Sequence, residues 1–383
     1  MLNLEDFLNL KPLYYDEIDY TRMPKAWESI KRNFKLPKII HVVGTNGKGS
    51  TGRFIAHYFY KSGYRVAHYS SPHILKLNER FWYNGKNVSD LELNEAHQKL
   101  LSILDKKFQD TLSYFEYLTL LAITLFQDCD FLILEAGLGG DKDATNVFDK
   151  ELSIVCKIDY DHQDFLGDSI EQIAKEKLKS IQKFAILGEQ KYKLIYKLAM
   201  KFSKERRLEI FKSSHFFIPP EIKEIESFIK NSNYPSFFTQ NLTLAISALK
   251  FFGLDIDLDK FSDLKIFGRC QKIASNITID VGHNELAASV LKKEFENKKI
   301  VLIYNSFKDK DYKKILKILK PIIKRIEFLP ILNKRVEDKK LLEDVAKEYL
   351  IEYKDFENIN EHEEYLVFGS FAVVESFLKL KGY

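Results

Sequence analysis

Cysteine is scarce in this sequence. The chain of 383 residues has three cysteines, Cys129, Cys156 and Cys270, and the spacings between them are not those of metal ligands. Because three is an odd number, at least one thiol has no disulfide partner within the chain. Unpaired thiols are typical of a reducing compartment, so we expect a cytoplasmic protein.

Long apolar runs and a large excess of one charge are lacking too. No stretch approaches the roughly 20 apolar residues that a membrane span needs, and residues 1–6 do not resemble the start of a signal peptide. The formal net charge is only +4, and lysines are spread along the chain. This spread indicates solvated faces, although a small positive excess suits anionic substrates. We therefore expect neither a membrane nor a nucleic acid as a partner.

The length favours two domains, and 45% hydrophobic with 30% charged residues is typical of globular proteins. Strand-like apolar runs alternate with helical periodicity along the chain. These runs are Ile39–Val43, Val66–Tyr69, Phe131–Leu134, Ser153–Ile158, Ile277–Val281, Lys299–Tyr304, Arg325–Leu329 and Tyr365–Phe368. The alternation predicts an α/β fold with doubly wound, mostly parallel sheets.

The chain between the two sets of strands gives the domain boundary. The segment Phe216–Ser236 contains Pro219 and Pro220 and is expected to be irregular, with a helix over residues 240–252 after it. We place the boundary at Gly268. The expected domains are residues 1–267 and a smaller C-terminal domain of residues 268–383.

The most informative segment is a glycine-rich turn, Gly44–Ser50, between the strand-like run Ile39–Val43 and a helical pattern. Such a turn cradles phosphate, because its backbone N–H groups approach the anion, the helix terminus adds a favourable dipole and Lys48 adds a charge. An ordinary glycine-rich turn is the alternative. The spacing is shorter than in the common phosphate loop, which argues against GTPases and kinases.

Polar residues follow each strand-like run of the first half. Ligands of open parallel sheets bind beyond the carboxyl ends of strands. The turn follows the first run, Ser71 the second, Glu135 the third and His162 the fourth. Each residue alone could be a turn residue, a solvated strand end or a surface histidine. Their convergence beside a phosphate loop predicts Mg²⁺ held mostly by nucleotide phosphates.

Lys177 lies in the middle of an apolar helical stripe that starts at Ile170. A lysine facing the core is costly unless it is paired, and burial lowers its pKa. The neutral amine can react with CO₂ to form a carbamate, which is an anion able to bind a metal. The alternatives are a side chain that snorkels past the stripe, or one that pairs with Glu171 or Glu176.

Glu116 poses a similar question. The pattern of Phe115–Phe126 is apolar nearly all round and predicts a buried helix. A carboxylate within such a helix needs a partner or a role. The alternative to a functional role is a satisfied buried glutamate near the start of the helix.

Together these segments resemble the folylpolyglutamate synthase/dihydrofolate synthase family of the Mur ligase superfamily, over nearly the whole chain. The resemblance implies a P-loop ATP-binding domain of the Mur ligase type and a Rossmann-like glutamate-ligase domain. It implies ATP contacts by Gly44, Thr45, Asn46, Gly47, Lys48, Gly49, Ser50, Asn241, Arg269, Asp280 and His283. It implies two Mg²⁺ sites, one with the ligands Ser71 and Glu135 and a second with His162 and carbamylated Lys177. It implies a pteroate or folate pocket with Tyr114, Phe115, Glu116, Asp143 and Ala144.

Three positions depart from the pattern of that family. Cys270 stands where the family has an aromatic residue, and Gly282 stands where it has alanine. Both are small changes. Asp141 stands where the family usually has a basic residue, a difference that concerns contacts to pterin or glutamate rather than the ATP chemistry.

The resemblance implies ATP-driven amide bond formation. A substrate carboxylate attacks the γ-phosphate to give an acyl phosphate, and the amine of L-glutamate then displaces phosphate. The residues with implied catalytic roles are Lys48, Lys177 and His283. The resemblance also implies that ATP lies between the two domains and that closure near Gly268 brings Arg269 and Asp280 to the nucleotide.

We expect a monomer with both activities of the family, glutamate addition to dihydropteroate and to tetrahydrofolate or folylpolyglutamate. The alternatives are a folylpolyglutamate synthase alone, another Mur-type amide ligase, or an ATP-binding module without catalysis. A cell-wall Mur ligase is disfavoured because too few residues precede the first strand for a separate UDP-sugar-binding domain.

Overall fold

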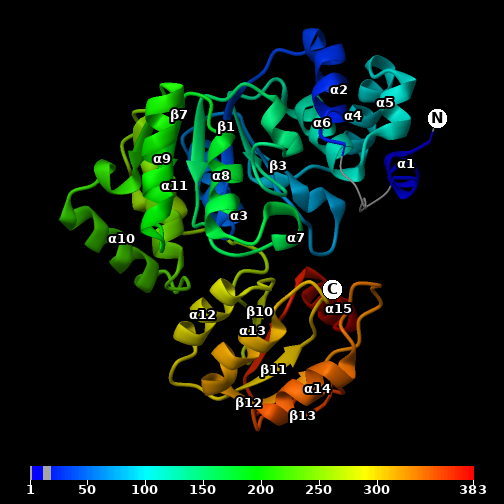
Figure 1. Cartoon of the computed structure of the whole chain (residues 1–383), viewed down its shortest axis with the longest axis vertical. Helices are drawn as coiled ribbons and strands as arrows, with labels where there is room; N and C mark the ends of the chain where they lie inside the picture. The colour runs from blue at the N-terminus through cyan, green and yellow to red at the C-terminus, as the bar shows by residue number, and fades with distance from the viewer. Residues whose placement is uncertain (1, 12–18) are drawn as a thin grey trace. The chain divides into compact units, whose positions relative to one another are not determined.

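The computed structural model describes residues 2–11 and 19–383, which form two compact units (Figure 1). The first unit extends to Ser232 and includes Phe238–Leu264, and the second consists of Asn233–Phe237 and Lys265–Tyr383. Each unit is built around its own sheet. The predicted class, α/β with mostly parallel sheets, is confirmed. The functional boundary at residue 268 stays a prediction and lies close to the change of unit at Lys265.

The sheet of the first unit has eight strands among the described residues, in the order β4-β3-β2-β5-β1-β6-β7-β8. The strands are β1 (Lys38–Val43), β2 (Val66–Tyr69), β3 (Phe81–Tyr83), β4 (Lys86–Asn87), β5 (Phe131–Glu135), β6 (Leu152–Val155), β7 (Phe184–Leu187) and β8 (Glu209–Lys212). Neighbours from β2 to β8 pair in parallel, whereas β3 and β4 are antiparallel at one edge. The four strands predicted to end in site residues, β2, β5, β1 and β6, are therefore direct neighbours.

Helices cover both faces of this sheet. They are α1 (Leu4–Asn9), α2 (Arg22–Ile30), α3 (Lys48–Lys61), α4 (Asp90–Ile103), α5 (Lys106–Thr111), α6 (Tyr114–Phe126), α7 (Gln163–Leu166), α8 (Ile170–Lys179), α9 (Lys193–Arg206), α10 (Pro219–Asn231) and α11 (Phe238–Phe251). Among the described residues, no helix is long and apolar enough to cross a membrane.

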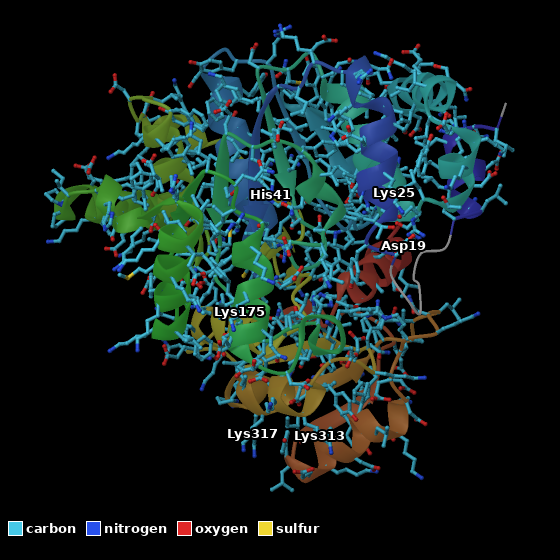
Figure 2. The ribbon with its side chains drawn as sticks, turned by 45° about the horizontal axis from the view of Figure 1, so that its top comes forward. Asp19, Lys25, His41, Lys175, Lys313 and Lys317 are labelled. Carbon is cyan, nitrogen blue, oxygen red and sulfur yellow. The ribbon has the colours of Figure 1, made fainter. Side chains whose placement is uncertain are left out.

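The alternation of side chains along the strands decides which helices cover which face. In β5, Leu132 packs in the cluster around α4 and α6, whereas Phe131 stacks on Phe59 of α3 with 4.0 Å between ring centroids. In β1, Ile39 packs in the cluster with α6, and Val43 packs on the same face with α8 and α9. The polar His41 lies between these two residues of β1 and is fully buried (Figure 2).

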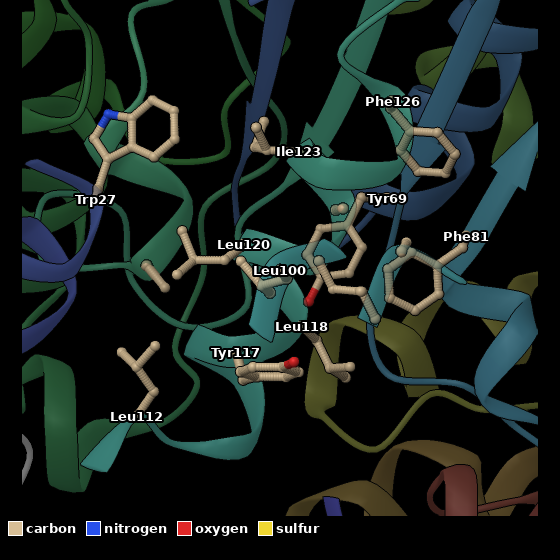
Figure 3. Close-up of a cluster of buried hydrophobic side chains, with 14 of the residues drawn as sticks. Trp27, Tyr69, Phe81, Leu100, Leu112, Tyr117, Leu118, Leu120, Ile123 and Phe126 are labelled. Atoms are coloured by element: carbon tan, nitrogen blue, oxygen red, sulfur yellow. The ribbon is translucent and has the colours of Figure 1, made fainter. Parts of the chain in front are cut away.

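The apolar cluster that contains Ile39 and Leu132 joins the amino-terminal helices to the sheet (Figure 3). Trp27 of α2 meets Phe148 edge to face, with 4.8 Å between ring centroids. Tyr69 of β2 packs near Phe81 at 5.3 Å. Helix α6 is buried on nearly all sides, as its apolar pattern predicts. The cluster therefore holds α2 and α6 in place, and both helices contribute residues to the site described below.

The expectation of an irregular segment at residues 216–236 is wrong over most of its length. Helix α10 spans Pro219–Asn231. Pro219 and Pro220 occupy its first turn, where the missing N–H groups would have no helical partner and where the fixed φ of proline suits a helix. The two prolines therefore mark the start of a helix. The helix expected over residues 240–252 is present as α11.

The second unit has a six-stranded sheet with the order β13-β12-β11-β14-β10-β9. Its strands are β9 (Gln271–Ala274), β10 (Ile277–Asp280), β11 (Ile300–Tyr304), β12 (Ile323–Phe328), β13 (Glu352–Asp355) and β14 (Tyr365–Phe368). Its helices are α12 (Glu285–Glu294), α13 (Tyr312–Leu319), α14 (Lys339–Glu348) and α15 (Phe371–Leu380). All strand pairs are parallel except β9 with β10. The return of the chain to β14, between β10 and β11, makes this a doubly wound sheet.

Candidate active site

The glycine-rich turn after β1 adopts a backbone conformation that glycine provides at little cost. Gly47 has φ +87° and precedes Lys48, the first residue of α3. A Cβ on Gly47 would lie 2.6 Å from Oδ1 of Asn241, and a Cβ on Gly44 would lie 2.7 Å from Cβ of Cys156. The structure therefore brings Asn241, which is distant in sequence, against the turn, and the turn presents the first N–H groups of α3.

The remaining residues of the turn are tied to the segment after β6. The backbone N–H of Thr45 donates to the carbonyl oxygen of Lys157 at 2.9 Å, and its hydroxyl donates to the carbonyl oxygen of Asp159 at 2.9 Å. Asn46 forms a β-bridge with Lys157, and Ser50 is buried in the first turn of α3. These contacts fix the turn at the edge of the sheet.

Ser71 and Glu135 meet at the ends of the neighbouring strands β2 and β5. The backbone N–H of Ser71 donates to Oε2 of Glu135 at 3.2 Å, and Nζ of Lys48 lies 3.9 Å from Oε1. Gly49 passes so close that a Cβ there would lie 3.2 Å from the same carboxylate. A buried carboxylate beside a hydroxyl side chain and a phosphate loop is suited to a divalent cation whose other ligands are phosphate oxygens.

Lys177 is buried on α8, and its Nζ donates to the carbonyl oxygen of Gly44 at 3.0 Å. Burial lowers the pKa of Lys177 to about 7. The alternative partners are engaged elsewhere, because Glu171 pairs with Lys175 at 2.7 Å and Glu176 accepts from a backbone N–H of the loop after β5. At neutral pH a large fraction of the Lys177 amine is therefore neutral, as carbamate formation requires.

His162, which the family resemblance pairs with Lys177 as a metal ligand, is less buried than that lysine. It has φ +50° and precedes the short helix α7. Its side chain is 37% exposed, and its Nε2 lies 3.9 Å from Oδ1 of Asp161. The predicted second pair of metal ligands thus combines a buried amine with a partly exposed imidazole.

A cavity of about 880 Å³ opens beside Ser71. All five predicted substrate residues line it, namely Tyr114, Phe115, Glu116, Asp143 and Ala144. Asp19 and Lys175, both labelled in Figure 2, lie in its wall near the start of α2 and on α8. Aromatic side chains share this lining with many charged and polar groups, an arrangement suited to a flat aromatic acid that carries polar substituents.

Glu116 is a partnered carboxylate as well as a cavity residue. Its Oε2 accepts the backbone N–H of Ser113 at 2.7 Å in a capping box and the Nε–H of Arg22 at 2.9 Å. The interpretation of Glu116 as a satisfied buried glutamate near a helix start therefore describes its environment. A contact between Glu116 and a substrate stays a prediction.

The sequence analysis missed several residues of the cavity wall. Arg22 and Trp27 come from α2, and Arg80 donates from its Nε to Nδ1 of His73 at 2.9 Å. The guanidinium of Arg80 also lies 5.5 Å from the ring centroid of Tyr114. The local signal for α2 is an apolar stripe at helical spacing, formed by Met23, Ala26, Trp27 and Ile30. That signal indicates a buried face but not which cavity the helix lines.

In the second unit, Asp280 lies at the carboxyl end of β10. Its Oδ2 accepts the backbone N–H of Cys270 at 2.8 Å, and its Oδ1 accepts that of Gly282 at 2.7 Å. Burial raises the pKa of the Asp280 carboxyl, and the nearby Arg269 opposes that shift. The departures Cys270 and Gly282 therefore both donate a backbone N–H to Asp280, and a Cβ on Gly282 would lie 2.7 Å from Oδ1 of that aspartate.

Arg269 and His283 flank this aspartate along the chain. The guanidinium of Arg269 lies 5.6 Å from the ring centroid of Phe371, which begins α15. Nδ1 of His283 lies 3.3 Å from the carbonyl oxygen of Val281, just before α12. The predicted nucleotide residues of the second unit thus gather around one strand end, the region where doubly wound sheets bind ligands.

The chain is similar in sequence and in structure to known proteins. Residues 42–218 match the family described as the Mur ligase middle domain. The dihydrofolate synthase/folylpolyglutamate synthase of Buchnera aphidicola subsp. Schizaphis graminum is 31% identical over 372 residues, which cover 89% of this chain and 87% of that protein. The crystal structure of Helicobacter pylori folylpolyglutamate synthetase has a TM-score of 0.81 and 38% identity, covering 99% of this chain and 98% of that one.

A further solved structure shows the same fold with ligands. The bifunctional folylpolyglutamate synthase/dihydrofolate synthase of Yersinia pestis, complexed with AMPPNP and Mn ion, has a TM-score of 0.82. The match covers 100% of this chain and 98% of that one, at 22% identity. At this identity the likeness concerns the fold alone.

Replacement of Gly47 by alanine is expected to raise KM for ATP by roughly tenfold or more, since a Cβ would collide with Asn241 and strain a backbone at positive φ. Steady-state ATP titration measures the effect. Gly63→Ala is the matched control, because Gly63 has φ +86° but no atom within 4 Å of the added Cβ. Equal KM values for Gly47→Ala and Gly63→Ala would contradict a role of the turn in nucleotide binding.

Proposed function

Because this chain belongs to the dihydrofolate synthase/folylpolyglutamate synthase family, we propose that the edge of its first sheet is where a pteroate or folate carboxylate is activated for glutamate. The protein is an ATP-dependent ligase that joins L-glutamate to dihydropteroate and to tetrahydrofolate and releases ADP. The reaction passes through an acyl phosphate. We assign ATP and a divalent metal ion to the site, on the phosphate loop and the oxygen donors beside it.

One observation carries the assignment of the site. Ser71 contacts Glu135, which lies beside Lys48 of the phosphate loop, and Ser71 also lines the cavity of about 880 Å³. A single residue thus connects the phosphate-binding turn with the pocket for the acid. This connection is what a phosphate transfer from ATP to a carboxylate needs, since the two reactants must lie in contact.

The first chemical step brings the substrate carboxylate to the γ-phosphate, and both are anions. We assign the positive charge that reduces their repulsion to side chains of this chain. Lys48 stands at the amino terminus of α3, where the helix dipole adds to its charge. In the second unit we assign Arg269, Asp280 and His283 to nucleotide binding, on their position around the end of β10. The amine of L-glutamate then attacks the acyl carbon, and phosphate leaves.

The residues present fit Mg²⁺. Glu135 offers a buried carboxylate and Ser71 a half-buried hydroxyl beside the phosphate loop, and oxygen donors are the ligands that Mg²⁺ prefers. We assign a second ion to His162 and to Lys177 as its carbamate, which forms when the neutral amine adds to CO₂ and loses a proton. When bound, the metal supplies positive charge that screens the phosphate oxygens.

The cavity is assigned to the pteroate or folate moiety. Tyr114, Phe115 and Ala144 supply apolar surface for flat rings, and Asp143 supplies an acceptor for N–H groups. Asp141 also lines the cavity, so the position that departs from the family faces the ligand in this proposal.

We also propose the compartment and the oligomeric state of the enzyme. We assign it to the cytoplasm, where its three cysteines would stay reduced. In support, all three are described in the structure and all three are free thiols. We also assign it as a monomer that acts on small molecules.

The purified protein is expected to release ADP when L-glutamate is added together with MgATP and dihydropteroate, and likewise with tetrahydrofolate. A coupled ADP assay measures both rates, and a UDP-muramoyl acid serves as the acceptor of the wrong class. Release with tetrahydrofolate alone would leave a folylpolyglutamate synthase, the activity named for the Helicobacter pylori structure. Release with the UDP-muramoyl acid alone would contradict the proposal, and so would nucleotide binding without ADP release.

Lys177→Ala is expected to lower kcat by roughly 100-fold, because it removes a metal ligand together with the contact to Gly44. ¹³C-labelled bicarbonate should give a carbamate signal in the NMR spectrum of the wild type but not in that of the variant. Lys201→Ala, at a lysine with 62% side-chain exposure, is the control. A wild-type rate in Lys177→Ala, or the same carbamate signal in both proteins, would refute the assignment.

A further inference from the structure

A buried hydrogen-bond relay lies behind the cavity wall formed by the loop after β5. The loop leads into a 3₁₀ turn, Ala144–Val147, which Asp143 caps. Asp143 and Ala144 line the cavity. Thr145 is fully buried on the other side of the same turn. The loop therefore has one side toward the ligand pocket and one side toward the interior of the first unit.

Asp143 is held through both carboxylate oxygens. Oδ2 accepts the backbone N–H of Leu138 at 2.8 Å, and Oδ1 accepts the N–H of Thr145 at 2.9 Å and its hydroxyl at 2.5 Å. Burial raises the pKa of the Asp143 carboxyl, and these donors oppose that shift. Since the protein groups on Asp143 are all donors, the carboxylate acts as an acceptor in this network.

His41 of β1 supplies the next link. Its Nε2 lies 2.8 Å from the hydroxyl oxygen of Thr145. A threonine hydroxyl has one proton, and the contact with Asp143 uses it, so Nε2 of His41 must carry a proton and donate to Thr145. Burial, together with the charge of Lys150, holds the pKa of His41 well below its usual value. The imidazole is therefore neutral, with its proton on Nε2.

A second buried base holds the same loop further along. Nζ of Lys150 donates to the side-chain oxygen of Asn146 and to the carbonyl oxygen of Ser180, the latter at 2.7 Å. Asn146 in turn donates from Nδ2 to the carbonyl oxygen of Asp141 at 2.7 Å. Asp141 and Asn146 both line the cavity, whereas Lys150 lies behind them. The loop is thus tied to the interior at Thr145 and at Asn146.

We propose that His41, acting through Thr145, is a positioning residue that fixes the Asp143 carboxylate for N–H donors of a flat heterocyclic acid in the cavity. This inference rests on the proposed function, because it concerns the same acid-binding site. His41 stands three residues before Gly44, so β1 orients both the phosphate loop and the wall of the acid pocket. The contact of Nε2 with Thr145 satisfies a buried N–H group and directs the threonine hydroxyl toward Asp143.

Paired variants separate the hydrogen bond from the volume of the side chain. His41→Leu keeps the approximate size and removes the donor, whereas His41→Gln retains an N–H donor at nearly the position of Nε2. His41→Leu is expected to raise KM for dihydropteroate by roughly tenfold, because a disordered supporting group loosens the site. KM for ATP should stay within about twofold of wild type, since none of the hydrogen bonds of this relay involves a residue of the phosphate loop. His41→Gln should restore most of the affinity for dihydropteroate.

A second pair keeps the test decisive if a change within β1 prevents folding. Thr145→Val removes the hydroxyl at nearly constant volume, and Thr145→Ser retains it. The valine variant should show the same rise in KM for dihydropteroate, and the serine variant should not. Circular dichroism and the melting temperature establish that each protein is folded before its kinetics are compared.

The outcomes distinguish this inference from the proposed function. A wild-type enzyme without ADP release on dihydropteroate or tetrahydrofolate would overturn both. An active wild type whose Leu and Gln variants at position 41 change equally, or whose two KM values rise together, would overturn the relay alone. A rise confined to the acid substrate and to the donor-free variants supports it.

Discussion

The common edge at which β2, β5, β1 and β6 end is the constraint on which the site depends. Parallel neighbours in a sheet carry their carboxyl ends to the same side. Because β1 leads into the glycine-rich turn, β5 ends at Glu135 and β2 leads to Ser71, the pairing of these strands brings a phosphate loop, a carboxylate and a hydroxyl together. The helices that hold the strands in register, α3 on one face and α6 on the other, therefore also preserve the geometry of the site.

Buried basic side chains hold the loops at this edge from the interior. Lys177 donates to the backbone of Gly44, His41 donates to Thr145, and Lys150 donates to Asn146. Burial of such groups costs free energy that hydrogen bonds offset only in part. The three contacts all end on loops that carry predicted nucleotide or substrate residues. The free energy spent on burying these polar groups therefore serves to orient two loops, the glycine-rich turn and the loop after β5.

The sequence predicted the strands of the site well, because buried parallel strands are continuous apolar runs and β1, β2 and β5 have nearly the expected bounds. Lys177 could be identified because a charge interrupts an apolar stripe. The cavity wall could not be derived in this way. Arg22 and Glu116 are far apart in the sequence, and their ion pair depends on tertiary packing rather than on a local pattern. The relay from His41 to Asp143 was missed for the same reason, since a histidine inside a strand gives no sign of its partner.

We expect this site to phosphorylate the substrate carboxylate before the amine of glutamate attacks. Dihydropteroate labelled with ¹⁸O in its carboxylate tests it directly, with ATP, Mg²⁺ and L-glutamate present and the released phosphate measured by mass spectrometry. One carboxylate oxygen is expected in the phosphate at each turnover, because the oxygen that attacks the γ-phosphorus stays bonded to it when the amide forms. Released phosphate without the label, at a normal rate of amide formation, would rule out an acyl phosphate at this site.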